Sequence, residues 1–147
     1  MQLLEALVER NYEAPITTAR HLAEQREISP FTRMALIFQA CRNSSAAFLK
    51  TQPSTTKAAP ERAFLHQKYM NHLIVSLKPV LASIIEQGIA QDLILCADPV
   101  SLAEIVLIVL TVKMDNTLVP STADEIEQTI SALVSLLEKE LRILRDR

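Results

Sequence analysis

The sequence has 147 residues, of which 49% are apolar and 22% charged, with a single glycine and a formal net charge of −2. One glycine excludes phosphate-binding loops and hairpin-rich folds, because both need several glycines for close backbone approach or positive φ. The balanced charge excludes a basic surface that would hold DNA by itself. The length fits one domain over residues 1–147, and the abundance of Leu, Ile, Ala, Glu and Gln predicts an all-α fold.

Prolines and caps divide the first half of the chain. An apolar pattern of helical period covers residues 1–27, and Pro15 within it predicts a kink or a short break. A Ser-Pro pair, which is typical of a helix start, opens a second helix over residues 29–49. The polar segment 51–59 has no apolar period, so we expect a loop there.

Three further helices are expected in the second half. The longest pattern begins at Pro60, continues past Pro79 with an expected bend, and ends around residues 88–92. An Asp-Pro pair opens a fourth helix over residues 98–114, and a Pro-Ser-Thr sequence opens the last one over residues 120–144. Together these patterns predict an antiparallel helical bundle of about five to six helices.

The last helix has two signals of its own. Thr122 and Glu125 have the spacing of a capping box, in which each side chain bonds the backbone of the other residue. Apolar residues then recur on one side, and Leu136 and Ile143 lie off that stripe. The helix therefore has more than one apolar face to bury.

The fourth helix indicates a second chain. Its apolar residues cover the whole circumference, and a domain of this size seldom wraps one helix completely. We therefore predict a homodimer formed through the last two helices of each chain. The predicted interface residues are Ile105, Ile108, Val109, Val112, Ile126, Ile130, Leu133, Leu137 and Leu141.

Patterns typical of enzymes and metal sites are weak. His21 and Glu24 are three apart but in the reverse order of the half-site used by di-metal helical bundles. The two cysteines, Cys41 and Cys96, have no CxxC spacing, and no Ser or Cys lies in a recognisable nucleophile context. We expect no enzyme activity, no catalytic residue, no metal and no cofactor.

Three segments together resemble tetracycline repressor-like (TetR family) transcriptional regulators. The opening QLLEALVER is similar to the helix that follows the DNA-binding head of that family. Residues 77–89, with proline and then an Ile-Ile-x-x-Gly ending, are similar to its long helix, and Asp98-Pro99 before an apolar helix is similar to its next element. Many members have a second glycine where this chain has Asp92, which can still adopt a left-handed helix cap.

The resemblance implies a C-terminal effector-binding and dimerisation domain whose ligand state reaches the DNA-binding head through the first helix. The family's helix-turn-helix head would lie before Met1, and no such motif is found in this sequence. The chain is expected to be either a fragment of a regulator or a headless dimer that binds a small molecule or a protein without DNA contact. In either case we expect no specific DNA binding by this chain as it stands.

A ligand cavity inside the bundle is the site that the resemblance implies. Candidates are the polar, polarisable and aromatic residues on otherwise apolar faces, although an ordinary core with Arg42 and His66 on the surface is the alternative for each. These pocket candidates are Tyr69, Phe38, Arg42, Gln39, Cys41, Phe48, Phe64, His66, Met70, Thr111 and Met114. The expected effector is an unidentified small molecule.

No targeting signal or membrane span is expected. An acidic residue, Glu5, stands where a signal peptide needs a basic region and an unbroken apolar core. The uncharged run 105–112 is shorter than the roughly 20 residues of a membrane-spanning helix. The sequence thus predicts a cytoplasmic protein with no membrane partner.

Overall fold

The computed structural model describes the backbone of residues 2–50, 59–115 and 120–143, and side chains within 13–46, 64–115 and 120–143. The predicted all-α fold is confirmed, since these residues form five helices and only an isolated bridge of β type. The helices are α1 (Gln2–Glu24), α2 (Pro30–Lys50), α3 (Ala59–Ala90), α4 (Pro99–Asp115) and α5 (Ala123–Leu141).

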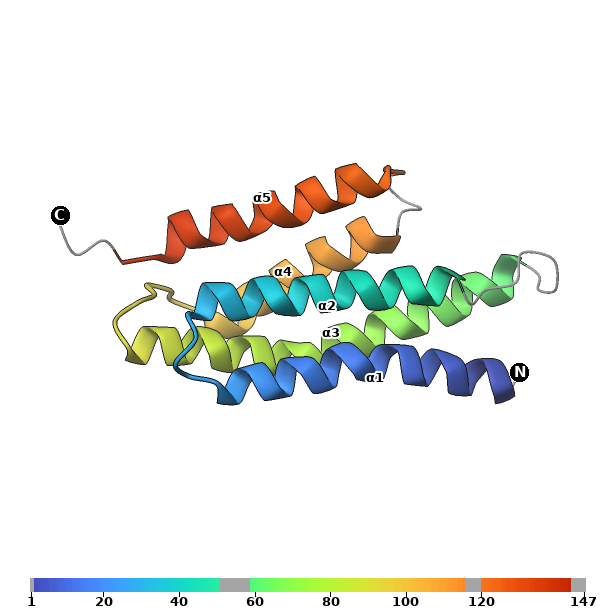
Figure 1. The fold of residues 1–147 in the computed structure, drawn as a ribbon, viewed down its shortest axis with the longest axis horizontal. Helices are drawn as coiled ribbons and strands as arrows, with labels where there is room; N and C mark the ends of the chain where they lie inside the picture. Colours follow the sequence, from blue (N-terminus) through green and yellow to red (C-terminus); the bar gives the residue numbers. More distant parts are fainter. Residues whose placement is uncertain (1, 51–58, 116–119, 144–147) are drawn as a thin grey trace.

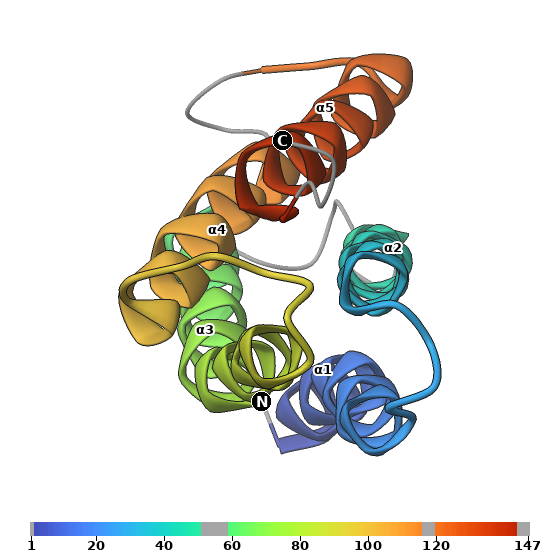
Figure 2. The ribbon, with the colours of Figure 1, turned by 90° about the vertical axis from the view of Figure 1, so that its left-hand side faces the viewer.

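The helices run alternately in opposite directions along the long axis of the molecule (Figure 1). Helix α3 packs against α1 and α4, while α2 packs against α1, α3, α4 and α5. The view along the helices shows α1 and α5 at opposite ends of the assembly, with α2 between them (Figure 2). The core therefore lies between α1, α2, α3 and α4, and α5 covers it from one side.

Both internal prolines are accommodated within helices. Helix α1 continues through Pro15 without a break and ends at Glu24, three residues before the predicted end. Helix α3 likewise runs through Pro79. A proline removes one backbone donor from a helix, but burial of the apolar face of the helix offsets that loss. Leu77 and Leu81, on either side of Pro79, are both buried. Ile16 and Leu22 after the first proline are both buried.

The capping box predicted at the start of α5 is confirmed. The Glu125 backbone N–H donates to Thr122 Oγ1, and the Thr122 N–H donates to a Glu125 carboxylate oxygen at 2.8 Å. At its other end α5 stops at Leu141, before the predicted residue 144. Extended backbone follows, where the Ile143 N–H donates to the Leu93 carbonyl. Residues 141–143 are thereby joined to the connection between α3 and α4.

The end of α3 explains why the single glycine is needed. A Cβ at Gly88 would overlap the Ile94 side chain, which folds back over the helix end. The Gly88 carbonyl accepts hydrogen bonds from the Leu93 and Ile94 N–H groups. Asp92 has a φ of 59°, so the expected left-handed cap at this residue is confirmed.

The core is almost entirely aliphatic. Its fully buried members come from all five helices and the loop before α4, and they include Ile16, Met34, Ile37, Phe38, Leu65, Leu73, Leu77, Leu81, Ile84, Ile94, Val106, Leu107, Leu110 and Ile126. The expected apolar face at residues 3–8 lies outside the described side chains.

Candidate functional site

Four polar side chains meet inside the bundle, and we call Ser44, His66, Tyr69 and Asp115 the core polar cluster. Tyr69 is fully buried, and its hydroxyl donates a hydrogen bond to Ser44 Oγ at 2.9 Å. The His66 ring stacks on the Tyr69 ring with centroids 6.1 Å apart. His66 Nδ1 in turn contacts a carboxylate oxygen of Asp115, so the cluster connects α2, α3 and the end of α4.

Burial dominates the electrostatics of this cluster. It lowers the pKa of His66, and the opposing effect of Asp115 is the smaller one. A neutral imidazole remains a donor at Nδ1 toward the carboxylate. Burial also raises the pKa of the Tyr69 hydroxyl, and it raises that of the Cys41 thiol to about 12. The raised pKa values of the Tyr69 hydroxyl and the Cys41 thiol disfavour their anionic forms, so this region suits hydrogen bonding to a polar organic group better than nucleophilic chemistry.

Five other pocket candidates are buried or half-buried. Phe38 and Cys41 of α2 and Met114 of α4 are buried, and Met70 packs partly buried against the same core. Thr111 is also buried, one helical turn before Asp115, where its hydroxyl donates to the Ile108 carbonyl. These residues form a continuous part of the hydrophobic core.

The polar candidates on α2 lie toward the surface. Arg42 is half-buried, with its Nε 3.5 Å from a carboxylate oxygen of Glu127, and so it joins α2 to α5. Gln39 is half-buried and donates to Asn43 on the same helix. Arg42 thus contacts α5, and Gln39 bonds within α2 near the surface.

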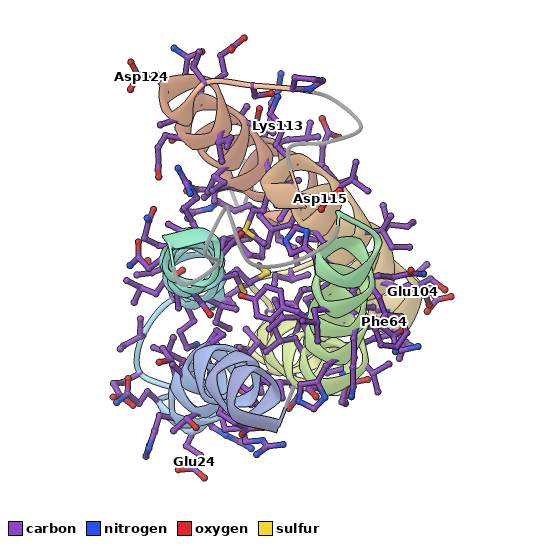
Figure 3. The ribbon with its side chains drawn as sticks, turned by 90° about the vertical axis from the view of Figure 1, so that its right-hand side faces the viewer. Glu24, Phe64, Glu104, Lys113, Asp115 and Asp124 are labelled. Atoms are coloured by element: carbon purple, nitrogen blue, oxygen red, sulfur yellow. The ribbon has the colours of Figure 1, made fainter. Side chains whose placement is uncertain are left out.

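Phe64 differs from the other aromatic candidates. It is 61% exposed and lies on the outer side of α3, whereas the labelled Asp115 lies where α4 ends beside α3 (Figure 3). Because successive helix residues are about 100° apart, Phe64 points away when Leu65 and Tyr69 face inward. The remaining aromatic candidate, Phe48, lies in the last turn of α2, outside the described side chains.

The outer face of α4 is apolar, and its large side chains are exposed in the part of the chain that the structure describes. Ile105, Ile108 and Val109 are 59%, 45% and 44% exposed, and Val112 is half-buried. Leu136 of α5 is 55% exposed. Ile105, Ile108, Val109 and Val112 are predicted interface residues, and Leu136 is one of the two apolar residues predicted to lie off the stripe of the last helix.

The apolar stripe of α5, which was predicted to lie at the dimer interface, is buried within the same chain. Ile126, Ile130, Leu137 and Leu141 are all at most 9% exposed, because α5 packs them onto the rest of the same chain, chiefly α2. Leu133 is half-buried against that core. Their surface is therefore already covered within one chain, which leaves Leu136 as the large apolar side chain of α5 that remains exposed.

Three polar residues of the interior were missed from sequence. Arg33 is completely buried, and it lies in register with Ile37 and Cys41 on the inward stripe of α2. Asp115 ends α4, where a carboxylate is unfavourable next to the negative end of the helix dipole. Ser44 adjoins the small Ser45 of the same stripe. An arginine in register with the core and an acid at a helix end are the signals by which Arg33 and Asp115 could have been found.

Two general features of the described residues complete the picture. Among them, no group of three or more His, Cys, Asp or Glu side chains is arranged to hold a metal ion. One segment, Phe64–Ala90 of α3, is long and apolar enough to cross a membrane by length and composition. This segment packs against α1, α2 and α4, and core helices of folded proteins meet the same criterion.

Comparison with known proteins gives one family match. Residues 49–136, more than half of the chain, match the family described as tetracyclin repressor-like, C-terminal domain. The match begins at the end of α2 and includes α3, α4 and most of α5. No curated protein and no solved structure matches the chain.

Proposed function

This chain belongs to the tetracycline repressor-like C-terminal domain family, and on that premise we propose that it is the dimerising, effector-binding domain of a transcriptional regulator. Domains of this family have a regulatory rather than an enzymatic role. The proposal has two parts, a homodimer through α4 and an effector site beside the core polar cluster. The observation that carries it is the exposed apolar face of α4, within the matched residues.

The dimer follows from the cost of leaving this face in water. Ile105, Ile108 and Val109 are neighbours on successive turns of one helix, and apolar patches of this kind mark protein interfaces. A two-fold axis through the face would bring each α4 against its own copy, with Leu136 of α5 at the side. An obligate interface of this type buries more than about 2,000 Å² in total and is more apolar than the remaining surface.

The effector site is proposed where polar groups enter the apolar core. Tyr69, His66 and Asp115 offer hydroxyl, imidazole and carboxylate groups among Phe38 and other apolar side chains. Sites for organic ligands combine apolar walls with a few placed polar groups in this way. An organic molecule that donates hydrogen bonds to the carboxylate suits the cluster best.

Coupling is proposed to pass from α3 to α1. The cluster residues His66 and Tyr69 belong to α3, which also packs along α1. A ligand that binds one packing of α3 more tightly than another shifts the population toward it, and α1 moves with that packing. In the full regulator, α1 would transmit the shift to the DNA-binding head.

Sedimentation equilibrium of the unmodified chain tests the central part of the proposal. We expect a dimer at about ten micromolar protein, because obligate apolar interfaces have submicromolar dissociation constants. A folded monomer at tens of micromolar, with the helical circular dichroism spectrum retained, would exclude a dimerisation domain. Substituting Tyr69→Phe tests the effector part, since it should weaken effector binding and leave the sedimented mass unchanged.

A further inference from the structure

A buried arginine stands out as incompletely satisfied. Arg33 is fully buried, and its Nη1 donates to Gln87 Oε1 at 2.7 Å and to the Leu22 and Ala23 carbonyls at 3.2 and 3.4 Å. Its Nε and Nη2 have no hydrogen-bond partner among the described residues. The nearby Glu27 acts on this guanidinium through space, without an ion pair between them among the described residues. A buried guanidinium with two unpaired nitrogen atoms is unfavourable unless another group compensates its charge.

A surface groove lies next to this guanidinium, between the end of α1 and the second half of α3. We call it the α1–α3 groove, and its lining consists of Arg20, Ala23, Glu24, Arg26, Pro79, Val80, Ser83 and Gln87. Two of these residues, Ala23 and Gln87, are among the three to which Arg33 Nη1 donates. The charged end of Arg33 therefore lies directly behind the wall of the groove.

The charge of the groove favours an anion. Arg20 and Arg26 are exposed in its lining, and Glu24 is the one acid among the lining residues. Arg33 behind the wall adds a third guanidinium group, and the nearby Glu27 adds a second carboxylate, so the cations outnumber the acids by one. The carbonyls at the end of α1 would ordinarily repel an anion. Here the Leu22 and Ala23 carbonyls already accept hydrogen bonds from Arg33, and Ala23 accepts another from Gln87.

The remaining lining is mostly apolar and favours a ligand that also has a hydrocarbon part. Pro79 and Val80 form apolar wall, with the Ser83 hydroxyl beside them. The space of about 620 Å³ lies in the range of small-molecule sites. Guanidinium groups bind carboxylates in paired, charge-assisted hydrogen bonds, and hydrocarbon packs well on proline and valine.

We propose that the α1–α3 groove binds a small organic carboxylate, with its charged group toward Arg20 and Arg26 and its hydrocarbon part on Pro79 and Val80. The site is separate from the core polar cluster and from the outer face of α4. Gln87 and Ala23 also accept hydrogen bonds from Arg33, and Gln87 donates to Ala23. A bound carboxylate would therefore contact the residues that connect the end of α1 to α3.

Isothermal titration calorimetry with hexanoate, and with 1-hexanol as its uncharged counterpart, tests the site on the whole chain. We expect saturable binding of hexanoate and none of 1-hexanol. The double substitution Arg20→Gln and Arg26→Gln should weaken hexanoate binding by about tenfold or more, since each lost charge-assisted bond has that order of effect. In nuclear magnetic resonance spectra, the side-chain amide signals of Gln87 should shift during the titration.

A matched control removes the same charge elsewhere. Lys68→Gln with Lys139→Gln changes two exposed cations on α3 and α5, and it should leave hexanoate binding within about twofold, because net charge alone is screened by salt. Equal binding by the Arg20/Arg26 variant, equal binding of 1-hexanol, or no binding of hexanoate would each overturn the proposal. If instead the arginine variant lowers the sedimented mass while hexanoate does not bind, the groove receives an acidic side chain of another copy, and the small-molecule site is wrong. The calorimetric outcomes do not depend on whether α4 forms the proposed dimer.

Discussion

The guanidinium of Arg33 donates from Nη1 to Gln87 Oε1 at 2.7 Å, which joins the first turn of α2 to the last turn of α3. The Gln87 amide in turn donates from Nε2 to the Ala23 carbonyl at 3.0 Å, so the end of α1 is held at the same point. Three helix ends are thus fastened by two side chains. The hydrogen bond between Arg33 and Gln87 involves a buried charge. Removing Gln87 is costly because the Arg33 guanidinium then remains buried without this acceptor.

Replacing Gln87 by Ala should lower the free energy of unfolding by about 1–3 kcal/mol, because it leaves a buried guanidinium donor without its acceptor. Urea denaturation measures the change. The matched control is Gln91→Ala, which removes an exposed amide one turn further along and should cost less than about 0.5 kcal/mol. Equal costs for the two variants would show that the link contributes no stability.

The depressed pKa of His66 predicts how stability changes with acid. Its folded-state pKa lies below the unfolded value near 6.5, so the unfolded chain binds the proton more readily. The stability from the neutral ring is full above about pH 6.5 and is lost as the pH falls through the lower, folded-state pKa. Chemical denaturation at several pH values between about 5 and 8 measures this slope.

Two substitutions separate the causes of this slope. His66→Gln should flatten the loss of stability in acid, because no imidazole remains to titrate. Asp115→Asn should steepen it, because removing the carboxylate takes away the group that raises the His66 pKa. A shallower slope in the Asp115→Asn variant would mean that the folded state favours the charged imidazole.

The single glycine gives a steric prediction. Gly88→Ala places a methyl group where the Ile94 side chain lies, so either Ile94 or the end of α3 has to move. Since overpacking of a buried site typically costs about 1–3 kcal/mol, a loss of that size is expected in thermal or urea unfolding. The double substitution Gly88→Ala with Ile94→Val should recover part of it. No loss in the single variant would show that the loop after α3 is free to shift.

The helices were predictable because their signals are local. Proline and cap residues determine the starts of α2, α4 and α5, and the Thr122–Glu125 capping box needs only a spacing of three. The end of α1 was placed three residues too late, since Glu24 and the residues after it are all compatible with a helix. The last carbonyls of α1, those of Leu22 and Ala23, accept hydrogen bonds from Arg33 of the next helix, a tertiary contact that no local pattern indicates.

The interior polar groups were only partly predictable for the same reason. Tyr69 and His66 were recognised as polar residues on an apolar helix, but their partners Ser44 and Asp115 lie on other helices. Periodicity also could not show that the apolar stripe of α5 packs on α2 of its own chain, because a stripe has the same sequence whether one chain or two cover it.

The outer face of α4 and the inner stripe of α5 allow one comparison that tests the dimer. Ile108 is 45% exposed, whereas Leu137 is 6% exposed. Ile108→Glu places its charge in water within the single chain and inside the interface of the proposed dimer, so we expect a folded monomer with an unchanged helical spectrum. Leu137→Glu instead places an unpaired charge in the core of the chain, which should cost more than about 3 kcal/mol and unfold the protein.

Sedimentation equilibrium and circular dichroism together distinguish these outcomes. The exposed Glu104→Gln on α4 is the matched control; it removes only an ion pair at the surface with Lys78 and should remain a folded dimer. If Ile108→Glu remains a dimer of normal stability, the outer face of α4 is not at the interface. If it unfolds as Leu137→Glu does, folding depends on the partner chain, and its stability should then rise with protein concentration, as it does for obligate dimers.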